Sequence, residues 1–194
     1  NAVLLMGALS ALIGGWTGLN QTQTRKIMAL SSIAHMGWLI IAMNMNLNTS
    51  TMVLLTYILM TTTAFMSMNM LMTKTIADLG TSWSQTPVLT TMLMLTLMSL
   101  GGLPPLTGFM PKWLILTQLC QTQMLILSLI MVLASLPSLF FYIRMTYLTT
   151  LTTPPNTKNT QYKWRFKPHV TQIMMPTMTL ATLTLPLMPM MITM

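Results

Sequence analysis

Long apolar runs alternate with short polar connectors along almost the whole chain. A helix that crosses a bilayer needs about 20 mainly apolar residues. We therefore predict six membrane segments, at residues 2–15, 27–43, 51–72, 87–119, 124–147 and 170–191. The fold class that follows is an all-α polytopic transmembrane helical bundle of about six spans, with residues 1–194 as a single membrane domain. Because the first run is shorter than a span, we expect that helices preceding it are missing from this sequence.

The fourth segment is too long for one straight span and contains a helix break. As a single helix it would reach about 48 Å, against a hydrocarbon core of about 30 Å. The adjacent Pro104 and Pro105 remove two backbone donors, so we expect the helix to end near residues 100–102. A second half-helix can begin at Thr107 or Gly108, with Pro111 in its first turn. The residues that form the predicted break are Gly101, Gly102, Pro104, Pro105, Gly108 and Pro111.

Lys112 lies about one turn into the restarted half-helix, near the interior of the predicted bilayer. Unwound backbone at this depth is tolerated only against protein or a water-filled cavity, and broken helices mark the ion and substrate sites of transporters. Burial and the positive end of the adjacent half-helix both disfavour the ammonium form. A lysine placed in this way can take up and release a proton, which makes Lys112 our candidate for proton transfer. The alternative is that Lys112 extends to the interface, beside Trp113 as part of an aromatic belt.

Other polar side chains also fall inside the predicted spans. In the second segment, His35 follows Ser31 and Ser32 at helical spacing, and Gly37 would let a neighbouring helix approach closely. The imidazole is a candidate proton relay near neutral pH, but a neutral ring bonded to a neighbouring carbonyl as packing is an equally good interpretation. The candidates to line a hydrated path are Ser31, Ser32, Ser128 and Ser135. The alternative is that each of these hydroxyls bonds back to its own helix.

The charge distribution indicates a membrane protein and excludes other classes. Charged residues make up 5% of the chain, against about 25% in soluble domains, and the mean hydropathy is +0.67. The net charge of +8 does not indicate nucleic-acid binding, because the cations lie at the ends of apolar runs rather than on one soluble face. Alternating the segments across a bilayer places on one side Arg25, Lys26, Lys74, Arg144, Lys158, Lys163, Arg165 and Lys167, and no charge in the opposite connectors. By the positive-inside rule that side is the cytosol or the mitochondrial matrix, and the C-terminus lies on the other side.

The sequence contains no constellation for covalent chemistry. Cys120 is the only cysteine, so no disulfide or CxxC site can form within the chain, and we expect it to be a small buried hydrophobe. Asp78 is the only carboxylate side chain, and we expect it to be a surface ion-pair partner after Lys74. We therefore predict no metal site and no cofactor site, and any reaction that the chain serves would take place on a partner.

Three sequence blocks resemble NADH dehydrogenase subunit 2 of mitochondrial respiratory complex I, an antiporter-like proton-pumping subunit family. They are GGWTGLNQTQTRKIMALSSIAHMGW, SLGGLPPLTGFMPKW and FYIRMTY, at residues 14–38, 99–113 and 141–147. The resemblance covers only the C-terminal part of that family. It implies a bundle in the mitochondrial inner membrane, with basic loops on the matrix side and the C-terminus toward the intermembrane space. Lys112 matches the family's lysine of the second broken helix, and His35 matches the histidine that follows the NQTQxRK connector.

The resemblance also implies a function within an enzyme. The chain would be a subunit of H⁺-translocating NADH:ubiquinone reductase that takes part in proton translocation and carries out no redox chemistry itself. NAD, FMN, iron–sulfur clusters and ubiquinone would bind to other subunits. The expected partners are the other membrane and peripheral subunits of complex I and the phospholipid bilayer, and no nucleic acid. Two alternatives are a stand-alone cation/proton antiporter and a purely structural membrane scaffold.

Overall fold

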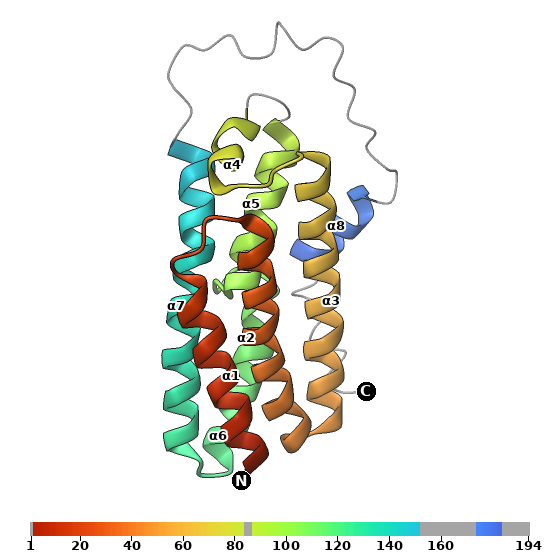
Figure 1. The fold of residues 1–194 in the computed structure, drawn as a ribbon. Coiled ribbons are helices and arrows are strands. Elements are labelled where there is room, and N and C mark those ends of the chain that lie inside the picture. Colours follow the sequence, from red (N-terminus) through yellow and green to blue (C-terminus); the bar gives the residue numbers. More distant parts are fainter. Residues whose placement is uncertain (1, 84–86, 152–173, 184–194) are drawn as a thin grey trace, which may run out of the picture.

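The computed structural model describes residues 2–83, 87–151 and 174–183, which form a bundle of helices (Figure 1). Within these ranges there are eight helices and no strand. In chain order they are α1 (Ala2–Gly18), α2 (Thr24–Met45), α3 (Leu47–Met70), α4 (Ile76–Ser82), α5 (Pro87–Gly101), α6 (Phe109–Gln121), α7 (Leu125–Leu151) and α8 (Met174–Leu183). The predicted all-α fold class is confirmed.

Three of these helices, α2, α3 and α7, are long and apolar enough to cross a membrane. The helices α1 and α5 are shorter and also apolar, and α5 with α6 covers the predicted fourth segment in two pieces. The predicted sixth segment, residues 170–191, lies partly outside the described residues, and α8 occupies its described part. Cys120, in the last turn of α6, is exposed, so the expectation of a buried cysteine is wrong.

The helices α1 and α2 pack with their backbones nearly in contact. A Cβ atom added to Gly37 would lie 2.5 Å from the carbonyl oxygen of Gly7 and 2.6 Å from the hydroxyl of Ser10. Small residues at a helix interface allow this approach, which increases van der Waals contact where lipid provides no hydrophobic driving force. The prediction that Gly37 admits a neighbouring helix is confirmed.

One end of the bundle carries a short helix, α4, that we did not predict (Figure 1). Its first turn is closed by a capping box, in which the Asp78 N–H donates to the Thr75 hydroxyl and the Thr75 N–H donates to the Asp78 carboxylate at 2.8 Å. The Lys74 N–H donates to the same carboxylate oxygen at 3.1 Å. These bonds, led by the one from the Thr75 amide, hold the pKa of Asp78 below its usual value. Asp78 is therefore a helix-capping residue, and the charge of the neighbouring Lys74 adds a smaller electrostatic attraction to its carboxylate.

Two connectors at this end are joined through their backbones by an isolated antiparallel bridge. The Thr24 N–H donates to the Lys74 carbonyl at 3.2 Å, and the Ile76 N–H donates to the Thr22 carbonyl at 3.1 Å. The Thr24 hydroxyl adds a further bond to the Lys74 carbonyl at 3.1 Å. The beginnings of α2 and α4 are thus fixed to each other.

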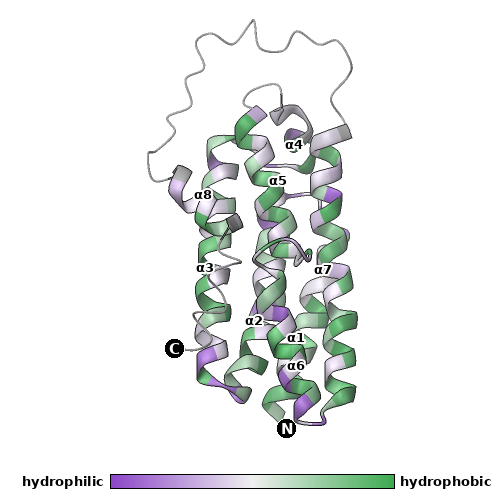
Figure 2. Ribbon diagram, turned by 180° about the vertical axis from the view of Figure 1, so that it is seen from behind, coloured by the Kyte–Doolittle hydropathy of each residue, from purple (hydrophilic) through white to green (hydrophobic). Residues whose placement is uncertain are grey.

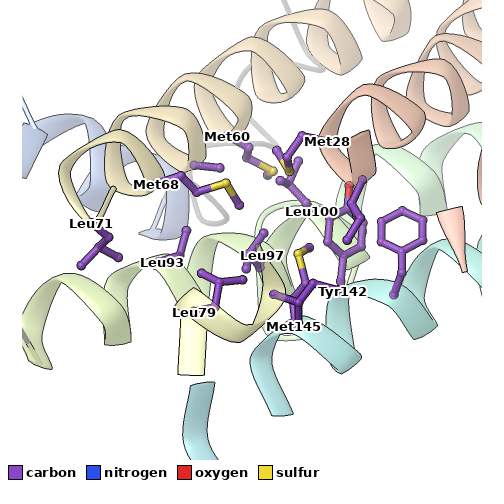
Figure 3. Packing of buried hydrophobic residues seen from close by; sticks show 14 of the residues in the cluster. Met28, Met60, Met68, Leu71, Leu79, Leu93, Leu97, Leu100, Tyr142 and Met145 are labelled. Atoms are coloured by element: carbon purple, nitrogen blue, oxygen red, sulfur yellow. The ribbon is translucent and has the colours of Figure 1, made fainter. Parts of the chain in front are cut away.

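Two clusters of buried hydrophobic residues fill the bundle, one toward each end. The cluster nearer α4 includes Met28, Met60, Leu97, Leu100 and Tyr142 (Figure 3). The other cluster consists of residues from α1, the second half of α2, the first half of α7, α6 and the beginning of α3. Hydrophobic residues predominate along the helices (Figure 2). The break between α5 and α6 lies near the middle of the bundle, between the two clusters (Figure 1).

Candidate functional site at the helix break

The first half-helix, α5, ends where the sequence predicts, in a turn that favours glycine. Gly102 follows the last residue of α5 and has a φ of 86°, in the left-handed region. Its N–H donates to the Ser99 carbonyl at 3.0 Å, and the Leu103 N–H donates to the Met98 carbonyl at 3.4 Å. This pair of bonds forms a Schellman motif, which satisfies two carbonyls at the end of the helix. The carbonyl of Gly101 takes no part in the motif.

The second half-helix, α6, begins after a tight crossing over the end of α5. Gly108 stands immediately before α6, and a Cβ atom there would clash with the carbonyl oxygen of Ser99. The hydroxyls of Ser99 and Thr107 lie 3.3 Å apart, and the Thr107 hydroxyl donates to a backbone carbonyl of α8. The unwound segment therefore packs against α5 and α8 at Thr107 and Gly108, whereas Pro104 and Pro105 are exposed.

The side chain of Lys112 reaches back across the break. Its Nζ donates to the Gly101 carbonyl at 2.9 Å, the carbonyl that the Schellman motif leaves out. The side chain passes over Gly102, where a Cβ atom would lie 3.0 Å from Nζ. We expected the positive end of the restarted half-helix to lie beside the ammonium group and, together with burial, to disfavour its charge. The structure instead places this group at the carbonyl end of α5, where the helix dipole presents partial negative charge.

Lys112 and His35 line the same small cavity. The volume of this cavity is about 30 Å³, which is enough for one or two water molecules. Its other lining residues include Tyr57 and Thr56 from α3 and Gly108 at the beginning of α6. The lysine and the histidine, which lie 77 positions apart in the sequence, are thus brought to one space in the middle of the bundle.

Two tyrosines contact the ring of His35. The hydroxyl of Tyr142 lies 3.4 Å from Nε2, and the donor in this contact depends on the tautomer of His35. The ring of Tyr57 is tilted against the imidazole, with 5.1 Å between the ring centroids. We did not identify either tyrosine from the sequence. The one available signal is a phenol in the middle of an apolar span, because a buried tyrosine hydroxyl usually has a hydrogen-bond partner.

The four candidate path-lining serines donate to carbonyls of their own helices, three residues earlier. These bonds, of 2.6 to 2.7 Å, run from Ser31 to Met28, Ser32 to Ala29, Ser128 to Leu125 and Ser135 to Val132. Ser31 also interacts with Tyr142, and Ser32 with Tyr57. None of the four serines lines the cavity beside Lys112. A path-lining role for them stays a prediction.

The groups around this cavity are suited to holding and passing protons. Lysine and histidine side chains both gain and lose protons in proteins, and the cavity between them is large enough for water. Within the described part of the chain, no group of three or more His, Cys, Asp or Glu side chains could hold a metal ion. The arrangement therefore offers acid–base groups at the level of the break.

Two family descriptions match consecutive parts of the chain. Residues 1–138 match the family described as NADH:quinone oxidoreductase/Mrp antiporter, TM. Residues 139–192 match the family described as NADH dehydrogenase subunit 2 C-terminus.

Curated relatives that are about half identical to the chain carry the name NADH-ubiquinone oxidoreductase chain 2. The one from Sylvisorex ollula is 50% identical over 194 residues, which are 100% of this chain and 56% of that relative. The one from Carassius auratus is 50% identical over 186 residues, 96% of this chain and 53% of that relative. The chain thus spans little more than half the length of these relatives.

Solved structures contain the same fold. A chain in the structure of respiratory complex I from Thermus thermophilus with bound aureothin matches with a TM-score of 0.79 and 25% identity, over 97% of this chain and 43% of that chain. A chain in the structure of the Mrp complex from Dietzia sp. DQ12-45-1b matches with a TM-score of 0.64 and 17% identity, over 74% of this chain and 28% of that chain. At 17% identity the second likeness shows the fold alone.

Proposed function

Since the chain belongs to the family of NADH:quinone oxidoreductase and Mrp antiporter membrane subunits, and its last part matches NADH dehydrogenase subunit 2, we propose that it is a membrane-arm subunit of proton-pumping NADH:ubiquinone oxidoreductase. In this role it takes part in proton translocation across the mitochondrial inner membrane. Lys112 holds and releases the proton, and His35 is the relay that exchanges it through the shared cavity.

The observation that carries the proposal is the position of the Lys112 ammonium group. It lies in the break, 2.9 Å from the Gly101 carbonyl, with apolar clusters toward both ends of the bundle. An ionisable side chain inside a membrane is costly to insert, so its presence there favours a function in ion or proton movement. When the bond to Gly101 breaks, the ammonium can turn toward the cavity and pass its proton through water to the imidazole of His35.

The redox reaction belongs, in this proposal, to other subunits of the complex. NAD, FMN, iron–sulfur clusters and ubiquinone bind there, and the residues of this chain hold and move a proton. The partners are the other membrane and peripheral subunits and the surrounding phospholipid. The basic connectors face the matrix and the C-terminus faces the intermembrane space. The positive-inside rule supports this orientation, because Arg25, Lys26 and Lys74 flank the bridge between the beginnings of α2 and α4, and Arg144 donates to the Leu19 carbonyl in the adjoining connector.

The substitution Lys112→Met tests the proposal in the full-length subunit within the assembled complex. We expect the number of protons pumped per NADH oxidised to fall by the share that this subunit contributes, because methionine cannot carry a proton. Lys112→Arg should also lower the number of protons pumped per NADH oxidised, since arginine retains its proton. Proton uptake into vesicles and NADH oxidation are measured in parallel. Lys26→Met is the matched control, because Lys26 is an exposed lysine away from the cavity and should not affect pumping.

The two competing functions predict different outcomes. A structural scaffold would keep normal pumping in an assembled Lys112→Met complex, and this result would remove the proposed role of Lys112. A stand-alone antiporter would exchange Na⁺ or K⁺ for protons in vesicles that contain the full-length subunit alone. We expect no such exchange, because the proposed subunit is driven by redox reactions in its partners.

A further inference from the structure

A second cavity, separate from the break, opens at the end of the bundle that carries α4. It lies between the beginning of α2 and the end of α3, and its volume is about 530 Å³. Its lining combines two cations, Arg25 and Lys74, with the apolar side chains of Phe65, Met66 and Met72. This combination has no part in the function proposed for the break.

We infer that this cavity binds the headgroup of an anionic phospholipid. The phosphate lies between the guanidinium of Arg25 and the ammonium of Lys74, and one acyl chain follows the outer face of α3. The inference rests on the membrane-spanning fold and is independent of the role proposed for Lys112.

The charge around this cavity is suited to a phosphate. Arg25 and Lys74 are both exposed, and the beginning of the 22-residue helix α2 adds the positive end of its dipole. Asp78, the only carboxylate side chain in the sequence, does not line the cavity, and its Oδ2 accepts the backbone N–H groups of Lys74 and Thr75. Basic pockets between membrane helices on the positive side bind anionic lipid headgroups.

An exposed apolar stripe runs from the cavity along α3. Phe65, Ile58 and Leu54 are 49%, 48% and 41% exposed, and their spacing of seven and four residues places them on one face of the helix. Thr61 lies on this face between Ile58 and Phe65, and its hydroxyl donates to the Tyr57 carbonyl of its own helix at 2.8 Å. At 1.5 Å per residue the stripe is about 16 Å long, close to half of a hydrocarbon core of about 30 Å. An acyl chain of one leaflet reaches this depth. The stripe therefore favours a lipid over a soluble anion or an acidic peptide, which would need only the charged part of the site.

The frame of the cavity is held by backbone bonds. The Thr24 N–H donates to the Lys74 carbonyl at 3.2 Å, which fixes the connector that carries Lys74 to the beginning of α2. Met72, two residues after the end of α3, has a φ of 52° in the left-handed region, and its N–H donates to the Asn69 carbonyl at 3.2 Å. The two cations thus stand on segments whose relative position is set before a ligand arrives, which lowers the entropy cost of binding.

Photocrosslinking tests the inference in the full-length protein within its native membrane assembly. The assembly is reconstituted in phosphatidylcholine vesicles with a trace of phosphatidylglycerol whose acyl chain carries a diazirine. We expect labelled peptides that contain Phe65 or Ile58. Arg25→Gln and Lys74→Gln should each lower this labelling about fivefold, and the double variant about 25-fold, because each cation contributes roughly that factor near an anionic surface.

Lys26→Gln is the matched control, because Lys26 is an exposed cation next to Arg25 that does not line the cavity. It should change the labelling by less than about twofold. Undiminished labelling of an assembled double variant, or an equal loss in the control, would overturn the site. If the double variant does not assemble, the two single variants decide in the same way.

Competition experiments separate the lipid from a free anion. Unlabelled phosphatidylglycerol added to the vesicles should displace the probe, whereas inorganic phosphate should not. Complete displacement by inorganic phosphate would overturn the lipid assignment and indicate an anion site. Equal labelling by a phosphatidylcholine probe with the same diazirine chain, at the same trace concentration, would also overturn it, because the cations would then have no role in selection.

Discussion

Among single residues, Gly108 and Lys112 decide how the chain continues past the break. Gly108 lies directly against the Ser99 carbonyl, and the Lys112 ammonium group donates a hydrogen bond to the Gly101 carbonyl. The two prolines end the first half-helix, but they are exposed and do not hold the two pieces together. The geometry of the break therefore depends on residues beside the prolines more than on the prolines themselves.

The substitution Gly108→Ala should strongly destabilise the protein. The added Cβ atom would clash with the Ser99 carbonyl, and overpacking of this kind costs about 1–3 kcal/mol or more. Gly101→Ala is the matched control, because its Cβ atom would lie 3.7 Å from the Tyr142 ring, an ordinary contact. Thermal unfolding of the full-length protein in its assembly should show a lower Tm for the first variant only. Equal Tm values for the two variants would contradict the tight crossing.

The sequence predicted the residues of the break but not the partners of its lysine. Proline and glycine act on the backbone at their own positions, so the end of α5 and the beginning of α6 follow from local rules. The bond between Lys112 and Gly101 depends on how the two half-helices are placed relative to each other. Tyr57 and Tyr142 reach His35 from helices that are distant in the sequence. Such contacts are set by packing, which a pattern of apolar residues does not specify.

Among the elements, the long apolar helices could be predicted from the sequence, whereas the shortest helix could not. The helices α2, α3 and α7 are long apolar runs, and their predicted segments agree with the observed helices to within a few residues. The seven-residue α4 is too short for an apolar period to be recognised. Its signal is the Thr75 and Asp78 pair of a capping box, which we interpreted only as a polar connector.

A fall in pH below about 4 should destabilise the helix α4. Hydrogen bonds from the Thr75 amide hold the pKa of Asp78 below its usual value of 3.8, so the ionised carboxylate stabilises α4 at pH values above about 4. This stabilisation is lost as the pH falls through the lowered pKa. Hydrogen exchange of residues 76–82, corrected for the intrinsic pH dependence, should show protection that decreases below about pH 4. Asp78→Asn should be less protected at neutral pH and show no further acid step. An acid step of the same size in this variant would contradict the assignment to Asp78.

For the whole molecule, the sequence predicts those properties to which many residues each make a small contribution. The all-α class and the one-sided charge follow from composition and segment order, and neither depends on which helix faces meet. The close contact of α1 with α2 at Gly37 does depend on one particular pair of faces. The sequence showed that Gly37 could admit a helix but not which one.

The exposed Cys120 provides a test of the proposed orientation. It lies at the end of α6, away from the basic connectors. In mitoplasts, which expose the intermembrane-space side, a membrane-impermeant maleimide should label Cys120 of the full-length protein in a background without other reactive cysteines. Thr22→Cys combined with Cys120→Ser should remain unlabelled until the membrane is permeabilised, because Thr22 is exposed at the basic end. The opposite labelling pattern would show that the orientation is reversed.

The backbone bridge between the beginnings of α2 and α4 has a mechanical consequence for the bundle. Because Thr24 and Ile76 both donate across it, α2 cannot swing at that end without carrying α4 and the adjoining end of α3. Displacement that starts beside His35, in the middle of α2, is therefore resisted at the bridged end. At the far end α2 passes into α3 through the single residue Asn46, which ties these two helices together as well. A movement of α2 is thus transmitted to its neighbours at both of its ends.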